Sequence, residues 1–219
     1  IEKTFYEVNN MISIEEYKQN PCEALSIPYW KATDIIIPDN VKIIHNKNFD
    51  ETLLEKYSDK QYFRLIHRLN YVPDFSNNDF TYKMLSKEKT NEIADMINAS
   101  YSHTDVFVSA DYIKGLTEAK VYFPELWIGA FDNSRLVGSI ICDLDTKIGE
   151  GIIEWLQILP EYRGKGIASV LVCKALNILK LNADFATVSG ECDNITNPES
   201  VYRKCGFIGN DIWHILTKR

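Results

Sequence analysis

The segment of this sequence best suited to chemistry is Pro160–Ala168, in which a proline is followed by two glycines and a predicted helix. Leu159 precedes the proline and is therefore held extended, so we expect a strand to end there. Gly164 and Gly166 allow the backbone to approach a ligand closely. The first N–H groups of a helix lack intrahelical partners and carry part of a positive charge. This segment therefore predicts a site for a diphosphate.

The same segment matches neither of two common phosphate-binding patterns. It lacks the G-x-x-x-x-G-K-S/T of a P-loop, and it lacks the G-x-G-x-x-G of a dinucleotide-binding domain. A strand-to-helix turn that needs glycine only for close packing would have the same residues. The segment alone therefore leaves both interpretations open.

A second segment, Asn197–Phe207, contains an Asn followed by Tyr-Arg-Lys-Cys-Gly-Phe. Together with the R-x-x-G-x-A pattern of Arg163–Ala168, it resembles the GNAT superfamily of N-acetyltransferases. The signatures of that superfamily are Q/R-x-x-G-x-G/A and an Asn followed by Y-x-K-x-G-F. The resemblance covers about residues 79–219 and does not extend to residues 1–78. It implies that acetyl-coenzyme A is the ligand of the diphosphate site.

The resemblance also implies roles for the residues around both motifs. Backbone N–H groups of Arg163–Ser169 would bind the diphosphate, and main-chain groups of Leu156 and Ile158 would pair with the pantetheine arm. The N–H of Ile158 would polarise the thioester carbonyl, Asn197 would hydrogen-bond near the pantetheine, and Tyr202 would protonate the departing thiolate. The residues implied to bind acetyl-coenzyme A are Leu156, Ile158, Arg163, Gly164, Lys165, Gly166, Ile167, Ala168, Ser169, Asn197 and Tyr202.

The acid role of Tyr202 is energetically reasonable. A phenol with a pKa near 10 is protonated at neutral pH, and its transfer of a proton to a thiolate of pKa near 8.5 costs roughly 2 kcal/mol. The alternative for Tyr202 is a core aromatic residue on a short amphipathic helix. That alternative stays open from the sequence.

The reaction also needs a base, because freeing an alkyl ammonium of its proton at neutral pH costs roughly 4.6 kcal/mol. Glu154 lies within the apolar run Ile152–Leu156, and burial there would raise its pKa toward the range useful to a general base. The alternative for Glu154 is an ion pair with a neighbouring element. Glu191 and Asp193, at the end of the next strand, are further candidates through a chain of water.

The composition argues against several other classes of protein. A net charge of -7 opposes nucleic-acid binding, because phosphates require a basic face. The five cysteines have no C-x-x-C spacing and the four histidines are scattered, so we expect no metal site, no disulfide framework and a reducing, cytoplasmic location. No apolar run reaches the roughly 18 residues of a membrane span, and no signal peptide is recognised. The abundance of Asn, Ile and Lys is typical of AT-rich bacterial genomes.

The expected fold class is α/β (α+β), a GNAT-type mixed and mostly antiparallel sheet flanked by helices, whose splayed central strands form the coenzyme A cleft. Turn-forming residues over 70–78 divide the chain into an N-terminal α/β extension, 1–78, and an acetyltransferase domain, 79–219. In the second segment we expect helices over 87–100, 164–181 and 198–204, and strands over 126–131, 136–143, 151–159, 185–191 and 207–216.

In the first segment we expect a short helix capped by Ser13 and a second capped helix over 50–57. The runs 33–37 and 41–45 have strand composition and flank a Pro-Asp-Asn turn, while 61–68 is compatible with strand or helix. This segment either covers the acceptor side of the fold or is a degenerate half-copy of it.

We therefore expect direct transfer of an acetyl group from acetyl-coenzyme A to a primary amine of a small molecule or peptide, in a ternary complex. A route through Cys205 or Cys142 is less favoured, because neither has a neighbouring histidine to activate it. Residues 101–114 are expected to shape the acceptor pocket, with a surface loop as the alternative. The rival interpretation is a non-enzymatic acyl-coenzyme A sensor, and in either case we expect a monomer or homodimer.

Overall fold

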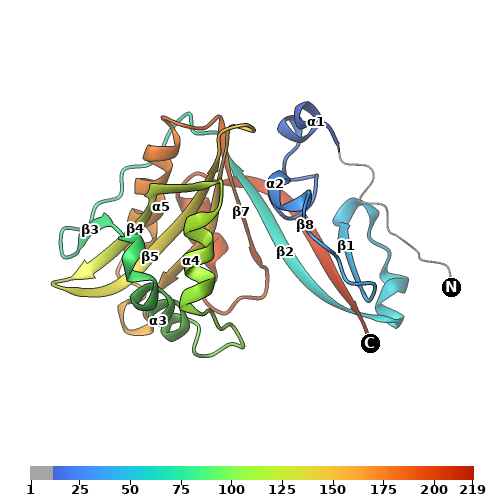
Figure 1. Cartoon of the computed structure of the whole chain (residues 1–219). Helices are drawn as coiled ribbons and strands as arrows, with labels where there is room; N and C mark the ends of the chain where they lie inside the picture. The colour runs from blue at the N-terminus through green and yellow to red at the C-terminus, as the bar shows by residue number, and fades with distance from the viewer. Residues whose placement is uncertain (1–11) are drawn as a thin grey trace. The chain divides into compact units, whose positions relative to one another are not determined.

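The structure is a computed structural model that describes residues 12–219 (Figure 1). The chain forms two compact units. The first contains the residues up to Ile66 together with Ser189–Glu199 and Ile208–Arg219, and the second contains His67–Val188 and Ser200–Phe207. Two C-terminal segments therefore group with the N-terminal region, and the functional division into 1–78 and 79–219 stays a prediction.

The first unit is built on a three-stranded antiparallel sheet with β8 (Ile208–Lys218) in its centre. β1 (Val41–His45) pairs with one edge of β8, where Ile43 lies opposite Ile215. β2 (Tyr57–His67) pairs with the other edge. The last strand of the chain thus joins two N-terminal strands, which explains why this unit is discontinuous in sequence.

Two short helices precede this sheet along the chain, α1 (Ile14–Gln19) and α2 (Tyr29–Ala32). The predicted cap of α1 is confirmed. The Ser13 hydroxyl accepts a hydrogen bond from the Glu16 N–H at 3.2 Å, and the Glu16 carboxylate accepts one from the Ser13 N–H at 2.7 Å. This reciprocal pair satisfies two N–H groups at the start of the helix.

A buried arginine fastens the region around α1 to β2. The Arg64 side chain donates to the carbonyl oxygens of Pro21 at 3.1 Å and Ser26 at 3.0 Å. It also donates to the hydroxyl oxygens of Tyr17 at 2.9 Å and Ser189 at 3.1 Å. These oxygens replace water around a guanidinium that is 1% exposed, as a buried cation requires.

The expected strand over 33–37 is wrong. These residues have no strand partner, and Ile36 is 91% exposed, so the run buries no apolar face. The strand over 41–45 is confirmed as β1, but its partner is β8 and not the run before the turn. Strand composition alone therefore did not reveal which run had a partner.

The expected helix over 50–57 is also wrong in type and length. The structure has a 3₁₀ helix over Glu51–Glu55, capped by the Asp50 side chain, which accepts from the Thr52 N–H. From Tyr57 onward the chain forms strand β2, because its backbone pairs with β8. That pairing also decides the open choice for 61–68 in favour of a strand.

The second unit contains a mixed sheet in the order β7-β6-β5-β4-β3. Its strands are β3 (Thr81–Met84), β4 (Tyr122–Asp132), β5 (Arg135–Asp145), β6 (Glu150–Ile158) and β7 (Phe185–Glu191), of which the last belongs to this unit through Val188. Neighbouring strands are antiparallel except β6 and β7, which are parallel. The prediction of a mixed, mostly antiparallel sheet is confirmed.

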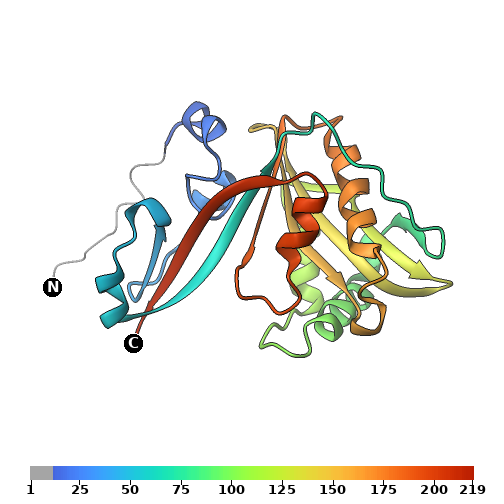
Figure 2. The same cartoon turned by 180° about the vertical axis from the view of Figure 1, so that it is seen from behind.

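Helices cover both faces of this sheet, as Figures 1 and 2 show from opposite sides. α3 (Thr90–Ser100) and α4 (Ala110–Glu118) lie on one face, and α5 (Ile167–Leu179) lies on the other. α6 (Pro198–Lys204) enters this unit at Ser200. Within residues 12–219, no helix combines the length and the apolar character that crossing a bilayer demands.

The predicted elements of the second unit are largely confirmed, with shifts at their ends. The hairpin between β4 and β5 turns at Asn133, whose φ of 54° is the left-handed conformation that such turns use. The helix expected from Gly164 begins at Ile167, because two glycines with positive φ come before it. The sequence analysis did not predict α4 or the short edge strand β3.

Candidate active site

A bulge interrupts β6 at Glu154. Trp155 pairs with Ile141 of β5 and Ile153 pairs with Cys142, so Glu154 is the extra residue in the register between the two strands. An extra residue of this kind bends a strand and disturbs its ladder. The parallel register between β6 and β7 also ends here, at Ile153. Beyond Glu154, β6 therefore still pairs with β5 but no longer with β7.

The main-chain groups of Leu156 and Ile158 point away from β5. The N–H of Leu159 donates to a carbonyl of the β5 residue Val137 at 3.0 Å, and alternate residues of an antiparallel pair face the partner. Side chains reach both outward carbonyls: Tyr101 Oη lies 3.4 Å from Leu156 O, and an Arg163 nitrogen lies 3.2 Å from Ile158 O. The two residues predicted to pair with pantetheine thus present their backbone on one edge.

Gly164 and Gly166 have φ angles of 77° and 78°, a region that glycine enters readily and other residues avoid. A Cβ at either position would meet no atom within 4 Å. The glycines are therefore required by backbone conformation, and the alternative of close packing is wrong at both. Gly166 starts α5 without a side-chain cap, so the N–H groups of Ile167–Ser169 lack both intrahelical and capping partners.

The loop before α5 is fastened to other parts of the second unit. Asn77 Nδ2 donates to Lys165 O at 2.8 Å, and Tyr162 Oη donates to Asp132 Oδ2 at 2.8 Å. Lys165 Nζ lies 4.6 Å from the centre of the Tyr162 ring. Ile167 is buried in the core, which anchors the first turn of α5. The glycine-rich start of the helix is thus held in place on both sides.

Tyr202 lies on α6 and is 5% exposed. Its ring meets the Phe207 ring edge-on, with centroids 5.8 Å apart. Burial is the main cause that raises the pKa of Tyr202 above that of an ordinary phenol, and the neighbouring Tyr101, Cys142 and Cys205 raise it further. The phenol is therefore neutral and able to donate, but complete proton transfer costs more than the roughly 2 kcal/mol of an ordinary tyrosine.

The expectation that Glu154 is a buried carboxylate is wrong. Glu154, Trp155 and Leu156 are half-buried within an otherwise buried strand, because the bulge turns this stretch out of the regular sheet. The carboxylate nonetheless lies near the buried thiol of Cys142, whose pKa is raised first by burial, then by Asp143 and by Glu154. Glu154 therefore sits at the edge of the protein interior, where water can reach it.

Three other predicted residues lie in the first unit. Asn197 is exposed and has a φ of 46°. Glu191 Oε1 lies 3.7 Å from Lys60 Nζ, and Asp193 is exposed. The second unit does not bring these residues together with Tyr202, so their roles stay predictions.

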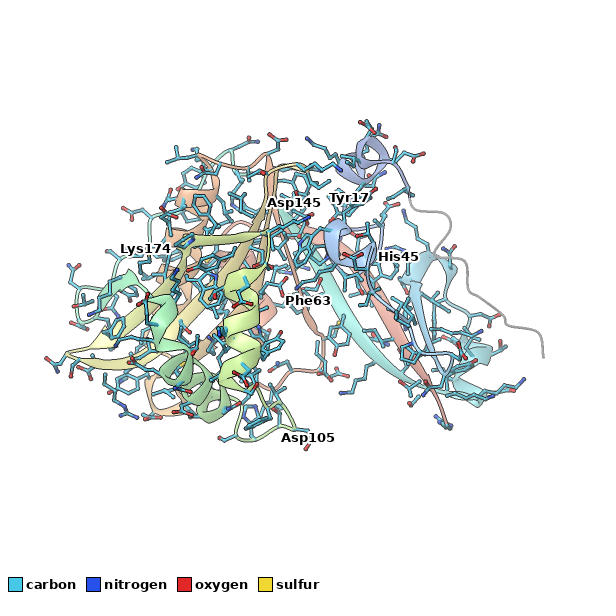
Figure 3. All side chains as sticks on the ribbon, in the orientation of Figure 1. Tyr17, His45, Phe63, Asp105, Asp145 and Lys174 are labelled. Atoms are coloured by element: carbon cyan, nitrogen blue, oxygen red, sulfur yellow. The ribbon has the colours of Figure 1, made fainter. Side chains whose placement is uncertain are left out.

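Two tyrosines flank Trp155 on the face of the sheet that α3 and α4 cover. The Tyr101 centroid is 5.9 Å away at 80°, and that of Tyr112 is 6.4 Å away at 82°. Residues 101–114 thus contact β6 from two points, while residues 102–107 between them are exposed, including the labelled Asp105 (Figure 3). Sequence reasoning missed the contact of Tyr112, although the Ser109 cap was a usable signal for its helix.

Neither of the two cysteines considered as a nucleophile, Cys142 and Cys205, is activated. All five are free, and Cys142 and Cys205 are fully buried. A hydrogen bond with Cys173 and then burial raise the pKa of Cys205, while burial is the main cause at Cys142. Both thiols are therefore held in their unreactive form. In the described part of the chain, no group of three or more His, Cys, Asp or Glu residues could hold a metal ion.

A comparison with known families decides the kinship of the chain. The Acetyltransferase (GNAT) family matches residues 81–207. The chain belongs to the GNAT acetyltransferase family. The matched GNAT region runs from β3 through Phe207 and includes both motifs on which the resemblance was based.

Individual relatives agree with this assignment. The chain is 37% identical over 89 residues to N-alpha-acetyltransferase 30 of Schizosaccharomyces pombe, a stretch that covers 39% of this chain and 59% of that protein. The chain thus spans only part of the length of this relative. The source organism stays a prediction.

Solved structures show the same GNAT fold. A GCN5-related N-acetyltransferase from Sphaerobacter thermophilus has a TM-score of 0.67 at 14% identity, over 87% of this chain and 64% of that chain. The NatC complex bound to a Gag peptide and coenzyme A gives a TM-score of 0.52 at 22% identity, over 64% of this chain and 99% of that chain. At these identities the likeness concerns the fold alone.

Proposed function

We propose that this GNAT protein transfers the acetyl group of acetyl-coenzyme A to a primary amine, and that the amine is the α-amino group of a peptide or protein. The observation that carries the proposal is the outward main-chain edge of β6 at Leu156 and Ile158, which leads through one short loop into the uncapped start of α5. Both features lie within the matched family region.

Two comparisons support a peptide amine as the acceptor. The relative from Schizosaccharomyces pombe is named as an N-alpha-acetyltransferase, and the NatC structure holds a peptide together with coenzyme A. The net charge of -7 is also compatible with a cationic acceptor. Polyamines and aminoglycosides are cationic as well, so the choice among amines requires an experiment.

In this proposal the main chain binds the donor. N–H groups of Gly164–Ser169, at the start of α5, attract the diphosphate, and the open space at Gly164 and Gly166 leaves room for it. The N–H of Arg163, included in the prediction from sequence, instead donates to Pro160 O at 3.2 Å. The N–H groups of Leu156 and Ile158 pair with the pantetheine arm as an added strand would. The N–H of Ile158 then polarises the thioester carbonyl.

The amine nitrogen forms a bond to the acetyl carbon as the carbon–sulfur bond breaks. The ammonium must first lose a proton, which costs roughly 4.6 kcal/mol at neutral pH. Glu154 accepts this proton, directly or through water, from its half-buried place at the bulge. Tyr202 donates a hydrogen bond to the departing sulfur. The attacking nitrogen loses a second proton as it becomes an amide. Because burial raises the pKa of Tyr202, this second proton reaches the thiolate through water.

We assign this activity to the cytoplasm. The five cysteines, all free, fit a reducing compartment.

No covalent enzyme intermediate is required, because the attacking amine and the thioester are held together in one complex.

The proposal is tested by incubating the protein with acetyl-coenzyme A and a panel of amines, and by following product masses. The panel contains peptides with a free N-terminus, polyamines, aminoglycosides and amino acids. The matched controls are the same peptides with a blocked N-terminus and an internal lysine. We expect acetylation of the free peptides and none of the blocked ones.

Two results would contradict the proposal. Transfer confined to polyamines or aminoglycosides would retain the acetyltransferase and remove the peptide acceptor. Tight binding of acetyl-coenzyme A without transfer to any amine would instead support the non-enzymatic sensor.

A further inference from the structure

The side chain of Arg163 bonds to the main chain of two separate elements. Its Nε donates to Ile158 O at 3.2 Å, and its Nη2 donates to Ser100 O at 2.6 Å. The shorter distance is typical of a strong, charge-assisted hydrogen bond. Arg163 therefore joins the end of β6 to the end of α3.

The Ser100 carbonyl is an acceptor that α3 cannot satisfy by itself. Ser100 is the last residue of the helix, and the final carbonyls of a helix lack intrahelical donors. A cation at this end also interacts favourably with the helix dipole. Ser100 is 1% exposed, so water cannot easily replace the arginine. Loss of the guanidinium would leave a buried acceptor without its strongest donor.

The loop that follows α3 depends on this end of the helix. Tyr101, the first residue after α3, contacts both Leu156 O and the Trp155 ring. Two bonds close the base of the loop: Asn98 Nδ2 donates to Val108 O at 2.9 Å, and the Val108 N–H donates to Asn98 Oδ1 at 2.9 Å. Residues 101–108 thus form a closed loop fixed at its base and beside β6.

The loop and the diphosphate site lie on different faces of the sheet. α5 covers one face, while α3, α4 and the loop lie on the other (Figures 1 and 2). Arg163 belongs to the segment before α5 but sends its side chain to α3. The Arg163 side chain therefore bonds to the element on the face opposite α5.

We propose that Arg163 is a positioning residue for the acceptor: its side chain holds loop 101–108 against β6 and does not bind the diphosphate. This inference rests on the proposed function, because it assigns the acceptor to the face that carries Trp155, Tyr101 and Tyr112. The backbone N–H of Arg163 donates to Pro160 O at 3.2 Å, so the donor site consists of the residues that follow, Gly164–Ser169.

The test is Arg163→Lys, which keeps the charge but places it on one ammonium that cannot reach both carbonyls. We expect the KM for a peptide acceptor to rise about tenfold, with kcat and the acetyl-coenzyme A Kd each changed less than about twofold. The matched control is Arg135→Lys, at an arginine that is 59% exposed and paired with Glu161. It should leave all three quantities unchanged. An acetyl-coenzyme A Kd weakened about tenfold, with the acceptor KM unchanged, would overturn the inference.

A second variant and a second measurement do not depend on transfer. Asn98→Ala opens the base of the same loop without changing β6 or α5. In both Arg163→Lys and Asn98→Ala, the amides of 101–108 should exchange hydrogen faster, while calorimetry gives an unchanged acetyl-coenzyme A Kd. Unchanged exchange in Arg163→Lys would overturn the positioning role. Should the wild type acetylate no amine, the proposed function fails, and the exchange and Kd data still decide what the Arg163 side chain does.

Discussion

The start of α5 and the loop after α3 lie in one unit but are determined in different ways. The start of α5 follows from its own residues, since the left-handed φ angles of Gly164 and Gly166 need glycine. The loop after α3 is held by side chains from elsewhere, including Arg163, which is 63 residues away from Ser100 in sequence. In the proposed function, donor binding is thus encoded locally in the backbone, whereas acceptor positioning depends on the completed fold.

The largest expected effect follows from Gly166→Val. A β-branched residue is strongly disfavoured at a φ of 78°, so the first turn of α5 must change its path. We expect acetyl-coenzyme A binding to be lost in calorimetry while the circular dichroism spectrum is retained, because a Cβ added at this position meets no atom within 4 Å. The control is Gly115→Val, also in open space but within α4, which should bind normally. Retained binding by Gly166→Val would refute the locally encoded site.

Tyr202→Phe is expected to have the next largest effect. Loss of the hydroxyl removes the hydrogen bond to the departing sulfur, so kcat should fall about 100-fold while the acetyl-coenzyme A Kd stays nearly constant. Tyr82→Phe is the control, because the Tyr82 hydroxyl is buried and finds no hydrogen-bond partner among the described residues. Steady-state kinetics with a peptide acceptor measure both. Unchanged turnover of Tyr202→Phe would leave Tyr202 as a core aromatic residue.

Glu154→Gln should have a smaller effect, since water at the half-buried bulge can partly replace the base. We expect kcat/KM to fall about tenfold at neutral pH, and the loss to shrink as rising pH deprotonates the amine without help. Glu125→Gln, at an exposed position on β4, is the control. A loss that is independent of pH would contradict a role in proton transfer.

The smallest effect concerns His67, which supports the Phe207 ring that packs on Tyr202. Burial lowers the pKa of His67, so the folded protein favours the neutral ring. The stability it contributes is complete above about pH 6.5 and is lost as pH falls through the lowered pKa. Melting curves should show a stronger loss of Tm below pH 6.5 in the wild type than in His67→Gln. Equal slopes would remove His67 as the cause.

The same contrast explains how much the sequence could predict. The strand before Pro160 and the helix that follows the two glycines were predicted, because proline fixes φ and glycine permits the left-handed conformation, both local properties of the chain. The family match over residues 81–207 confirms the kinship that these motifs indicated.

Features that depend on partners far along the chain were not predictable. The bulge at Glu154 arises from the register with β5, so the residue looked buried in the sequence and is half-buried in the fold. The run 33–37 has strand composition but no partner, whereas β1 found one in β8. The bond from Arg163 to Ser100 has no signature in either segment.

The central claim is that the donor is bound by backbone N–H groups at the start of α5 and on the edge of β6. Backbone amide hydrogen exchange, measured with and without acetyl-coenzyme A, tests it most directly. We predict slower exchange at Leu156, Ile158 and Ile167–Ser169 when acetyl-coenzyme A is added, and slower exchange in loop 101–108 once a peptide acceptor is present. Unchanged exchange at Ile167–Ser169 in the presence of saturating acetyl-coenzyme A would contradict the claim.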